Sequence, residues 1–257
     1  MSEKYSIRSA AHSLFTLFRG LGLILLIWWI TSLCAGERLF PSPFTVIPLF
    51  ARLTPKTLAA HAAKSLVRIG AGLAVSGLIA LPLGIAMGRI KALDEVLTPA
   101  SYLLYPVPKI AFLPVVLLLA GLGEASKIII VSLVLFFQVL VSVRDGAKNI
   151  EPEYIRQAKT LGAKPRHILT YVILPSLLPG LFSSLRVATG TAISVLFFAE
   201  TFSGSSGLGF YIMDAWVRVA YGEMFAGILA TALLGLGLMG GEDLLEWIVC
   251  PWNRKAA

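Results

Sequence analysis

Long apolar runs separated by short polar stretches are the main pattern along this chain. Five runs contain no Asp, Glu, Lys or Arg, and a sixth, from Val96 to Gly123, is apolar except for Lys109. A helix needs about 20 mostly apolar residues to cross a bilayer, whereas the strands of a membrane barrel alternate over about ten, and no such alternation is present. The pattern predicts an all-α integral membrane protein with about six transmembrane helices. The five uncharged runs are residues 20–36, 69–88, 128–143, 187–199 and 224–241.

One polar and basic island interrupts the apolar C-terminal half. Residues 153–175 are amphipathic, and the wider stretch 144–166 carries six Lys or Arg. The central Gly162 is typical of a turn, and Leu174-Pro175 closes the pattern. We interpret the island as a short helix, a turn and a second helix that lie on the membrane surface and press against a partner.

The rest of the chain is divided simply. We expect a cytoplasmic N-terminal segment (1–19), a first span with an outer segment (20–62), a transmembrane core (63–248) that includes the loop 144–175, and a cytoplasmic tail (249–257). The basic start, the apolar run and Cys34 resemble a cleaved leader. Because a lipoprotein site has a small residue before the cysteine and Leu33 is large, a retained first span is favoured.

The placement of Lys and Arg predicts the orientation. With the N-terminus inside, the cytoplasmic segments contain thirteen of the 22 basic residues. These are Lys4, Arg8, Arg19, Arg89, Lys91, the six of the 144–166 cluster, Arg254 and Lys255. A smaller group of basic residues would lie outside in this orientation and argues against it: Arg52, Lys56, Lys64 and Arg68. The larger cluster at 144–166 outweighs this group and determines the predicted orientation. Both termini and the loop 144–175 are therefore expected in the cytoplasm.

Composition excludes several classes of protein. With 57% hydrophobic residues, 14% charged residues and a mean hydropathy of +0.82, the chain is not a soluble globular domain. The net charge of +8 is explained by topology and by attraction to lipid headgroups, and no nucleic-acid partner is expected.

No motif predicts catalysis or metal binding. A P-loop sequence is absent, and the three histidines show neither metal-ligand nor triad spacing. Cys34 and Cys250 fall on opposite predicted membrane faces, which excludes a disulfide or a shared metal. Gly235–Gly240 matches a dinucleotide fingerprint but lies inside an apolar run. We interpret it, like Gly84–Gly88, as close helix packing through small residues.

Polar residues inside the spans are candidates for the translocation path, because such residues are costly in a membrane. Three prolines occur between Tyr105 and Pro114, around Lys109. We interpret this stretch as irregular backbone that lines a pathway; the alternative is a loop that only joins two short segments. Glu200 is either a gate or a tie between helices, and Arg186 can reach the inner interface. The path candidates are Lys109, Gln138, Thr189, Ser194 and Glu200, with Arg186 and Thr191 as further polar positions; any single Ser or Thr can instead bond the carbonyl one turn back.

The polar island resembles the loop of bacterial ABC importer permeases, which has the form E-A-A-x3-G-x9-I-x-L-P. Ala158, Gly162, Leu174 and Pro175 stand at the matching spacing, with Val172 for Ile. The departure is Arg156, where the family usually has Glu, which puts in doubt the ion pair that this Glu makes. In the family this coupling helix enters a groove of the ATPase subunit. The resemblance therefore implies a contact segment of Arg156, Gln157, Ala158, Gly162, Ala163 and Lys164, closed by Leu174 and Pro175.

Further motifs narrow the resemblance to the nitrate/sulfonate/taurine permease group, from about residue 41 to 248. They are Pro41-Ser-Pro43, His61–Arg68, Pro82–Gly88, Pro106–Pro114, Gly121–Lys127 and Gly207-Leu-Gly209. The resemblance implies the fold of type I ABC importer permeases, a homodimer in the bacterial inner membrane, and an external solute-binding protein. Separate ATPase subunits use ATP and Mg, so this chain binds no cofactor.

The substrate is the open point of the resemblance. A sulfonate, taurine, nitrate or a similar anion is expected; bicarbonate and thiamine or riboflavin precursors are alternatives. A stand-alone channel or secondary transporter is the rival class, and it predicts inverted repeats or a filter motif that the sequence does not show.

Overall fold

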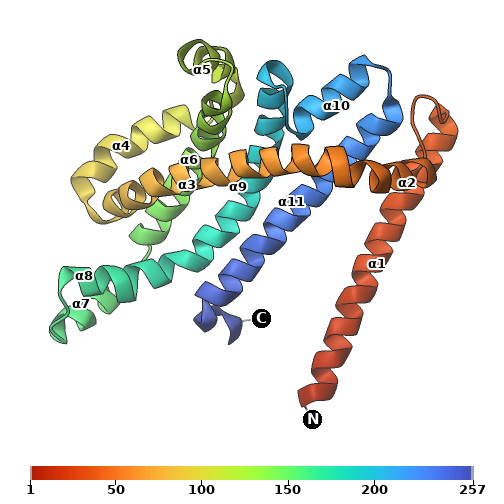
Figure 1. Ribbon diagram of the computed structural model, residues 1–257. Helices are drawn as coiled ribbons and strands as arrows, with labels where there is room; N and C mark the ends of the chain where they lie inside the picture. The colour runs from red at the N-terminus through yellow and green to blue at the C-terminus, as the bar shows by residue number, and fades with distance from the viewer. Residues whose placement is uncertain (1, 256–257) are drawn as a thin grey trace. The chain divides into compact units, whose positions relative to one another are not determined.

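The computed structural model describes residues 2–255, and the side chains of residues 18–202 and 204–253. Within residues 2–255 every regular element is a helix (Figure 1). The α-helices are α1 (Ser2–Ala35), α2 (Pro43–Leu53), α3 (Ala59–Arg89), α4 (Lys91–Leu104), α5 (Leu113–Ala120), α6 (Glu124–Lys148), α7 (Pro152–Thr160), α8 (Pro165–Ile168), α9 (Leu174–Ser203), α10 (Leu208–Val217) and α11 (Tyr221–Val249). The basic side chains at Lys4, Arg8, Arg254 and Lys255, used to predict the orientation, lie outside the described side chains.

Among the described residues, five helices are long and apolar enough to cross a membrane, and there are six when the bent pair α4 and α5 is taken as one broken span. This agrees with the six predicted spans. The helices are longer than the apolar runs, because a helix continues beyond the hydrocarbon as long as its backbone bonds are satisfied. The helix that contains the run 69–88 begins at Pro43, and the helix that contains 187–199 begins at Pro165.

The expectation that Leu174-Pro175 closes the second helix of the island is therefore wrong. Residues 165–202 form one helical stretch, with a π-helical turn at Leu169–Ile173. Pro175 lies in the first turn of α9. The π-turn shifts the helical register just before Pro175. In the first turn of α9 the missing N–H of proline leaves no hydrogen bond of that helix unmade.

The chain forms two compact units. The first contains the chain up to Ala59 together with Tyr211–Ala230, and the second contains Ala60–Phe210 and Thr231–Ala257. In the first unit Phe225 stacks on Trp28 at 6.0 Å between ring centroids and meets Phe40 edge-on at 4.7 Å. The Trp28 indole donates to the Pro41 carbonyl at 3.0 Å.

The core of the second unit is built around α6. Ile130 and Leu135 of α6 pack with Ala188 and Leu196 of α9, and all four are at least 98% buried. A second cluster continues along α6 to the island, where it includes Ile155 and other apolar side chains. Elsewhere large apolar side chains are exposed, for example Leu78, Leu118 and Leu119 at 79%, 85% and 84%. Such exposure is expected of surface that faces lipid.

Small residues bring α3 against α6, which confirms the packing interpretation of Gly84–Gly88. A side chain at Gly84 would place its Cβ 2.9 Å from Cβ of Val143, and one at Gly88 would lie 2.6 Å from Cβ of Ala147. The interpretation holds only in part for Gly235–Gly240. A Cβ at Gly235 meets Ile193 at 3.2 Å, but Gly237 and Gly240 have no such neighbour within 4 Å.

We expect Gly84→Leu to destabilise the protein by about 1–3 kcal/mol, because extra volume at this crossing forces α3 and α6 apart. The measurement is the thermal unfolding midpoint in detergent. Gly77→Leu in the same helix is the matched control, since a Cβ at Gly77 meets nothing within 4 Å. Equal midpoints for the two variants would contradict the packing argument.

Candidate translocation cavity and docking segment

The proline-rich stretch breaks the helical path, as predicted. Tyr105–Pro108 separate α4 from a 3-10 turn at Lys109–Phe112, and the two arms of the break are bent by 85°. Pro106 and Pro108 lack the N–H that would continue the helix. The freed backbone carbonyls thus face a local donor or a cavity rather than lipid.

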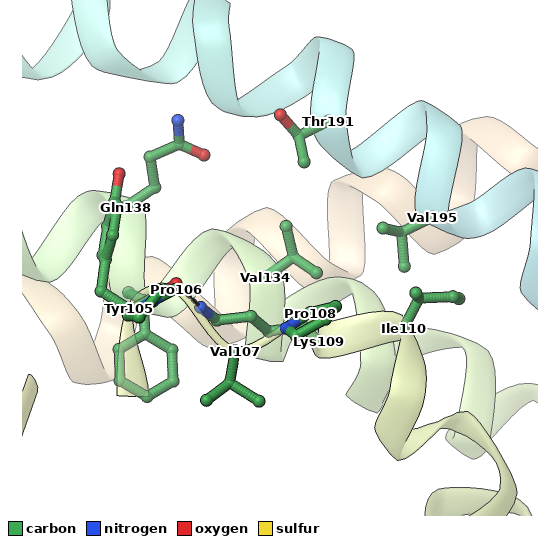
Figure 2. Close-up of a pocket in the computed structure, with 11 residues that line it drawn as sticks. Tyr105, Pro106, Val107, Pro108, Lys109, Ile110, Val134, Gln138, Thr191 and Val195 are labelled. Carbon is green, nitrogen blue, oxygen red and sulfur yellow. Dashed lines mark hydrogen bonds between the residues drawn. The ribbon is translucent and has the colours of Figure 1, made fainter. Parts of the chain in front are cut away.

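A cavity of about 400 Å³ lies beside this break, within the second unit. It is lined by Tyr105, Pro106, Val107, Pro108, Lys109, Ile110, Val134, Phe137, Gln138, Thr191 and Val195. Figure 2 shows Gln138 from α6 and Thr191 from α9 bordering the same space as the broken segment. Apolar walls with a few polar groups are typical of a small-solute site.

Lys109 contributes the cavity's positive charge. Its ammonium donates to the Leu104 carbonyl at 3.0 Å and to the Tyr105 carbonyl, and so caps the end of α4. It also lies 4.9 Å from the centroid of the Phe137 ring. These contacts hold the cation at the cavity wall. An ammonium has three N–H donors, so two carbonyl bonds leave it able to donate to a solute.

The other path candidates lie outside this cavity. Thr189 donates to Glu242 of α11 at 2.5 Å, and Ser194 bonds the Gly190 carbonyl one turn back at 3.1 Å. Arg186 pairs with Asp243 at 2.8 Å and with Glu246 at 2.7 Å. Of the predicted path residues, the structure therefore brings together Lys109 and Gln138, with Thr191 as a third.

Glu200 belongs to a separate buried cluster, centred on Arg68. The two side chains are each 1% exposed and lie 2.7 Å apart, and Arg68 also holds Glu124 at 2.6 Å. Of the two alternatives for Glu200, the geometry is that of a tie between helices. In the sequence Arg68 is an outer basic residue and the end of the motif His61–Arg68, yet among the described side chains it is the largest that is fully buried. Its position at the start of an apolar run was the available signal.

A second charged cluster ties α4 to the other end of α6. Arg144 donates to both carboxylate oxygens of Asp94 at 2.6 and 2.9 Å, and Lys148 reaches Asp94 at 2.8 Å. Arg144 follows Glu124 by 20 residues, which at about 1.5 Å per residue is about 30 Å along α6. That is the thickness of a bilayer's hydrocarbon core, so the two clusters fit its two interfaces.

The polar island forms the predicted helix, turn and helix. α7 ends in a Schellman motif: Gly162 N–H donates to the Lys159 carbonyl at 2.9 Å and Ala163 N–H to the Ala158 carbonyl at 3.0 Å. Gly162 has φ +78°, the left-handed conformation that this cap requires. The backbone thus reverses sharply at Gly162 and starts α8.

Apolar anchors hold this docking segment, which we define as residues 152–168, against the core. Ile155 and Ile168 are buried, with Ala158 and Ala163 packed beside them. Arg156, Gln157 and Lys164 are exposed, and Arg156 lies 3.6 Å from Glu153. Since Arg156 is also 71% exposed, this pair contributes little to stability. The segment presents polar side chains together with the exposed Tyr154 and Leu161 (55% and 88%) on an apolar base, which suits a docking surface.

A broken span beside a cavity with a few polar groups, together with a capped helical hairpin at one end of α6, is the arrangement expected of an ABC importer permease. Residues 80–246 match the family described as "binding-protein-dependent transport system inner membrane component", and the chain belongs to it. It is a multi-pass inner-membrane permease, as the sequence predicted.

Characterised relatives agree with this assignment. The chain is 34% identical over 243 residues to the taurine transport system permease protein of Escherichia coli (strain K12), covering 91% of this chain and 88% of that protein. It is 30% identical to a putative aliphatic sulfonates transport permease of Bacillus subtilis (strain 168), covering 86% and 80%. The nitrate import permease of Synechocystis sp. is 26% identical, covering 91% and 89%.

A solved structure confirms the fold class. An inward-facing form of the MetNI methionine ABC transporter matches with a TM-score of 0.62 at 20% identity, covering 74% of this chain and 94% of that chain. The predicted family, fold and importer function are thus confirmed. The relatives are transport subunits and not enzymes themselves.

Proposed function

We propose that this permease carries a small anion, a sulfonate such as taurine or an inorganic oxyanion such as nitrate, through the cavity beside Lys109. The observation that carries the proposal is the Lys109 ammonium, fixed at the wall of a cavity that also contains Gln138 and Thr191. The cation attracts the anion, while the amide N–H of Gln138 supplies a hydrogen bond that replaces its water. The Thr191 hydroxyl donates to the Val187 carbonyl at 3.3 Å and would have to rotate away from it to donate to the anion. The named substrates of the relatives, taurine, sulfonates and nitrate, support this class.

The energy comes from a separate ATPase subunit that docks on residues 152–168. The exposed contact residues of this proposal are Arg156, Gln157, Gly162 and Lys164, with Ala158 and Ala163 beneath them. ATP and Mg bind to that partner. Leu174 and Pro175 then start α9, which reaches the cavity at Thr191 and Val195. Because α9 is continuous between these points, a displacement of the docked segment reaches the cavity walls.

The complete importer contains two copies of the permease and an external solute-binding protein. Both termini and the loop 144–175 face the cytoplasm, and the exposed apolar surface is in contact with lipid. The family description, which names a binding-protein-dependent system, supports the external partner. Alternating access follows when ATP binding to the partner favours one of two packed conformations of the permease over the other.

Uptake measurements test the anion proposal. In proteoliposomes that contain the permease, its ATPase and its binding protein, we expect ATP-driven uptake of labelled taurine or nitrate. Lys109→Ala should lower uptake about ten- to hundred-fold, because a hydrogen bond to a charged group contributes about 1.5–3 kcal/mol. Lys109→Arg keeps the charge and should retain most of the activity. Wild-type uptake by Lys109→Ala would contradict the proposal.

A further inference from the structure

Arg68 connects four parts of the second unit, and each N–H of its guanidinium donates a hydrogen bond. Nε and one Nη donate to the two carboxylate oxygens of Glu124, at 2.7 and 2.6 Å. The Nη that donates to Glu124 also donates to the Ser206 hydroxyl at 3.0 Å. The other Nη donates to Glu200 at 2.7 Å and to the Ser206 carbonyl at 2.8 Å. All five N–H donors are therefore paired. The joined parts are α3, the first turn of α6, the end of α9 and the loop before α10.

This cluster lies at the opposite end of α6 from the docking segment. Glu124 begins α6, whereas α6 ends at Lys148, just before α7. In Figure 1, α5 and the α7–α8 hairpin lie at opposite ends of α6. When the docking segment faces the cytoplasm, the cluster is at the face where the binding protein delivers solute. It ties the helix ends together there.

The two carboxylates that pair with Arg68 have different surroundings. Glu200 is 1% exposed and also accepts from the Ser65 hydroxyl and the Gly209 N–H, each at 2.8 Å. A Cβ at Gly207 would lie 2.2 Å from the carboxylate carbon of Glu200, and one at Gly209 would lie 2.5 Å from the Phe197 carbonyl oxygen and 3.0 Å from Glu200 Cβ. Glu124, by contrast, is 55% exposed. Water can replace Arg68 as the partner of Glu124, but no water reaches Glu200 to do the same.

We propose that the Arg68–Glu124 pair is a releasable latch that keeps this end of the permease closed at rest, and that Glu200 is the fixed anchor of the latch. During opening α6 and Glu124 separate from Arg68, while Arg68 stays with Glu200 and the loop at Ser206. Arg68 and Glu124 are thus positioning residues for transport. The inference rests on the proposed orientation of the importer.

The test is Glu124→Gln, which removes the charge and keeps the shape. A weakened latch lowers the free-energy difference between closed and open states, and so increases the open population without binding protein. In the reconstituted complex with its ATPase, we expect basal ATP hydrolysis to rise about five-fold and stimulation by loaded binding protein to fall by the same factor. Glu124→Asp restores the carboxylate and should move both values back toward wild type.

Glu95→Gln is the matched control, because Glu95 is also an exposed carboxylate, paired with Lys91 at 3.6 Å on α4. It should leave both ATPase values unchanged. Basal hydrolysis at the wild-type level in Glu124→Gln would overturn the latch. A rise of equal size in Glu95→Gln would overturn it as well, since any lost surface charge would then suffice.

The outcome of the Glu124→Gln test can be distinguished from that of the uptake test of the anion proposal. Wild-type complex without taurine or nitrate uptake would refute the proposed substrate class, while the ratio of basal to stimulated hydrolysis would still report the latch. Normal anion uptake with an unchanged ratio in Glu124→Gln would refute the latch alone.

Discussion

Replacing Arg68 with alanine should destabilise the permease by about 3–5 kcal/mol, because the buried Glu200 carboxylate would lose its cation. Glu200 would keep the Ser65 and Gly209 donors but would lose its ion pair with Arg68. The loop at Ser206 would also lose its two contacts with Arg68. The measurement is thermal unfolding of the purified protein in detergent, followed by size-exclusion chromatography.

Arg218→Ala is the matched control. Arg218 also bridges two carboxylates, Asp214 at 2.8 Å and Glu223 at 2.7 Å, but it is 48% exposed. Exposed pairs contribute about 0–1 kcal/mol, so its loss should change the midpoint little. The double variant Arg68→Met with Glu200→Gln removes both charges and should be more stable than Arg68→Ala. An Arg68→Ala protein as stable as Arg218→Ala would refute the importance of burial.

Local features were predictable because their causes lie within a few residues of sequence. The spans follow from uninterrupted apolar runs, and the reversal at Gly162 follows from one glycine at the end of an amphipathic stretch. The irregular segment around Lys109 follows from its prolines, because Pro106 and Pro108 lack the backbone N–H that would continue the helix. In each case the physical constraint acts on adjacent residues.

The Arg68 cluster was not predictable in the same way. Its partners Glu124 and Glu200 are 56 and 132 residues away, and their meeting depends on how α3, α6 and α9 pack. Likewise Thr189 and Ser194 could not be separated from Thr191 by sequence, since the rotation of α9 decides which side chain faces the cavity. Only Thr191 does so. A polar residue in a span signals a partner, but not which partner.

Replacing Gly162 with valine should abolish stimulation of ATP hydrolysis by substrate-loaded binding protein, while the permease still inserts into the membrane. Gly162 has φ +78°, and a Cβ there would meet nothing within 4 Å. The cost is therefore backbone strain and not a clash, and it is large for a β-branched residue. Relief of this strain opens the Schellman cap and redirects α7, so Arg156 and Lys164 no longer share one docking surface.

Two controls separate docking from general strain. Asparagine tolerates the left-handed region, so Gly162→Asn should retain most of the stimulation. Gly36 has φ +85° and equally open surroundings, but it follows α1 and is not part of the docking segment. Gly36→Val should thus carry similar strain and keep the coupling. If the complex with Gly162→Val responds to loaded binding protein with wild-type ATP hydrolysis, the turn at Gly162 does not transmit the motion of the ATPase subunit, and the docking assignment is refuted.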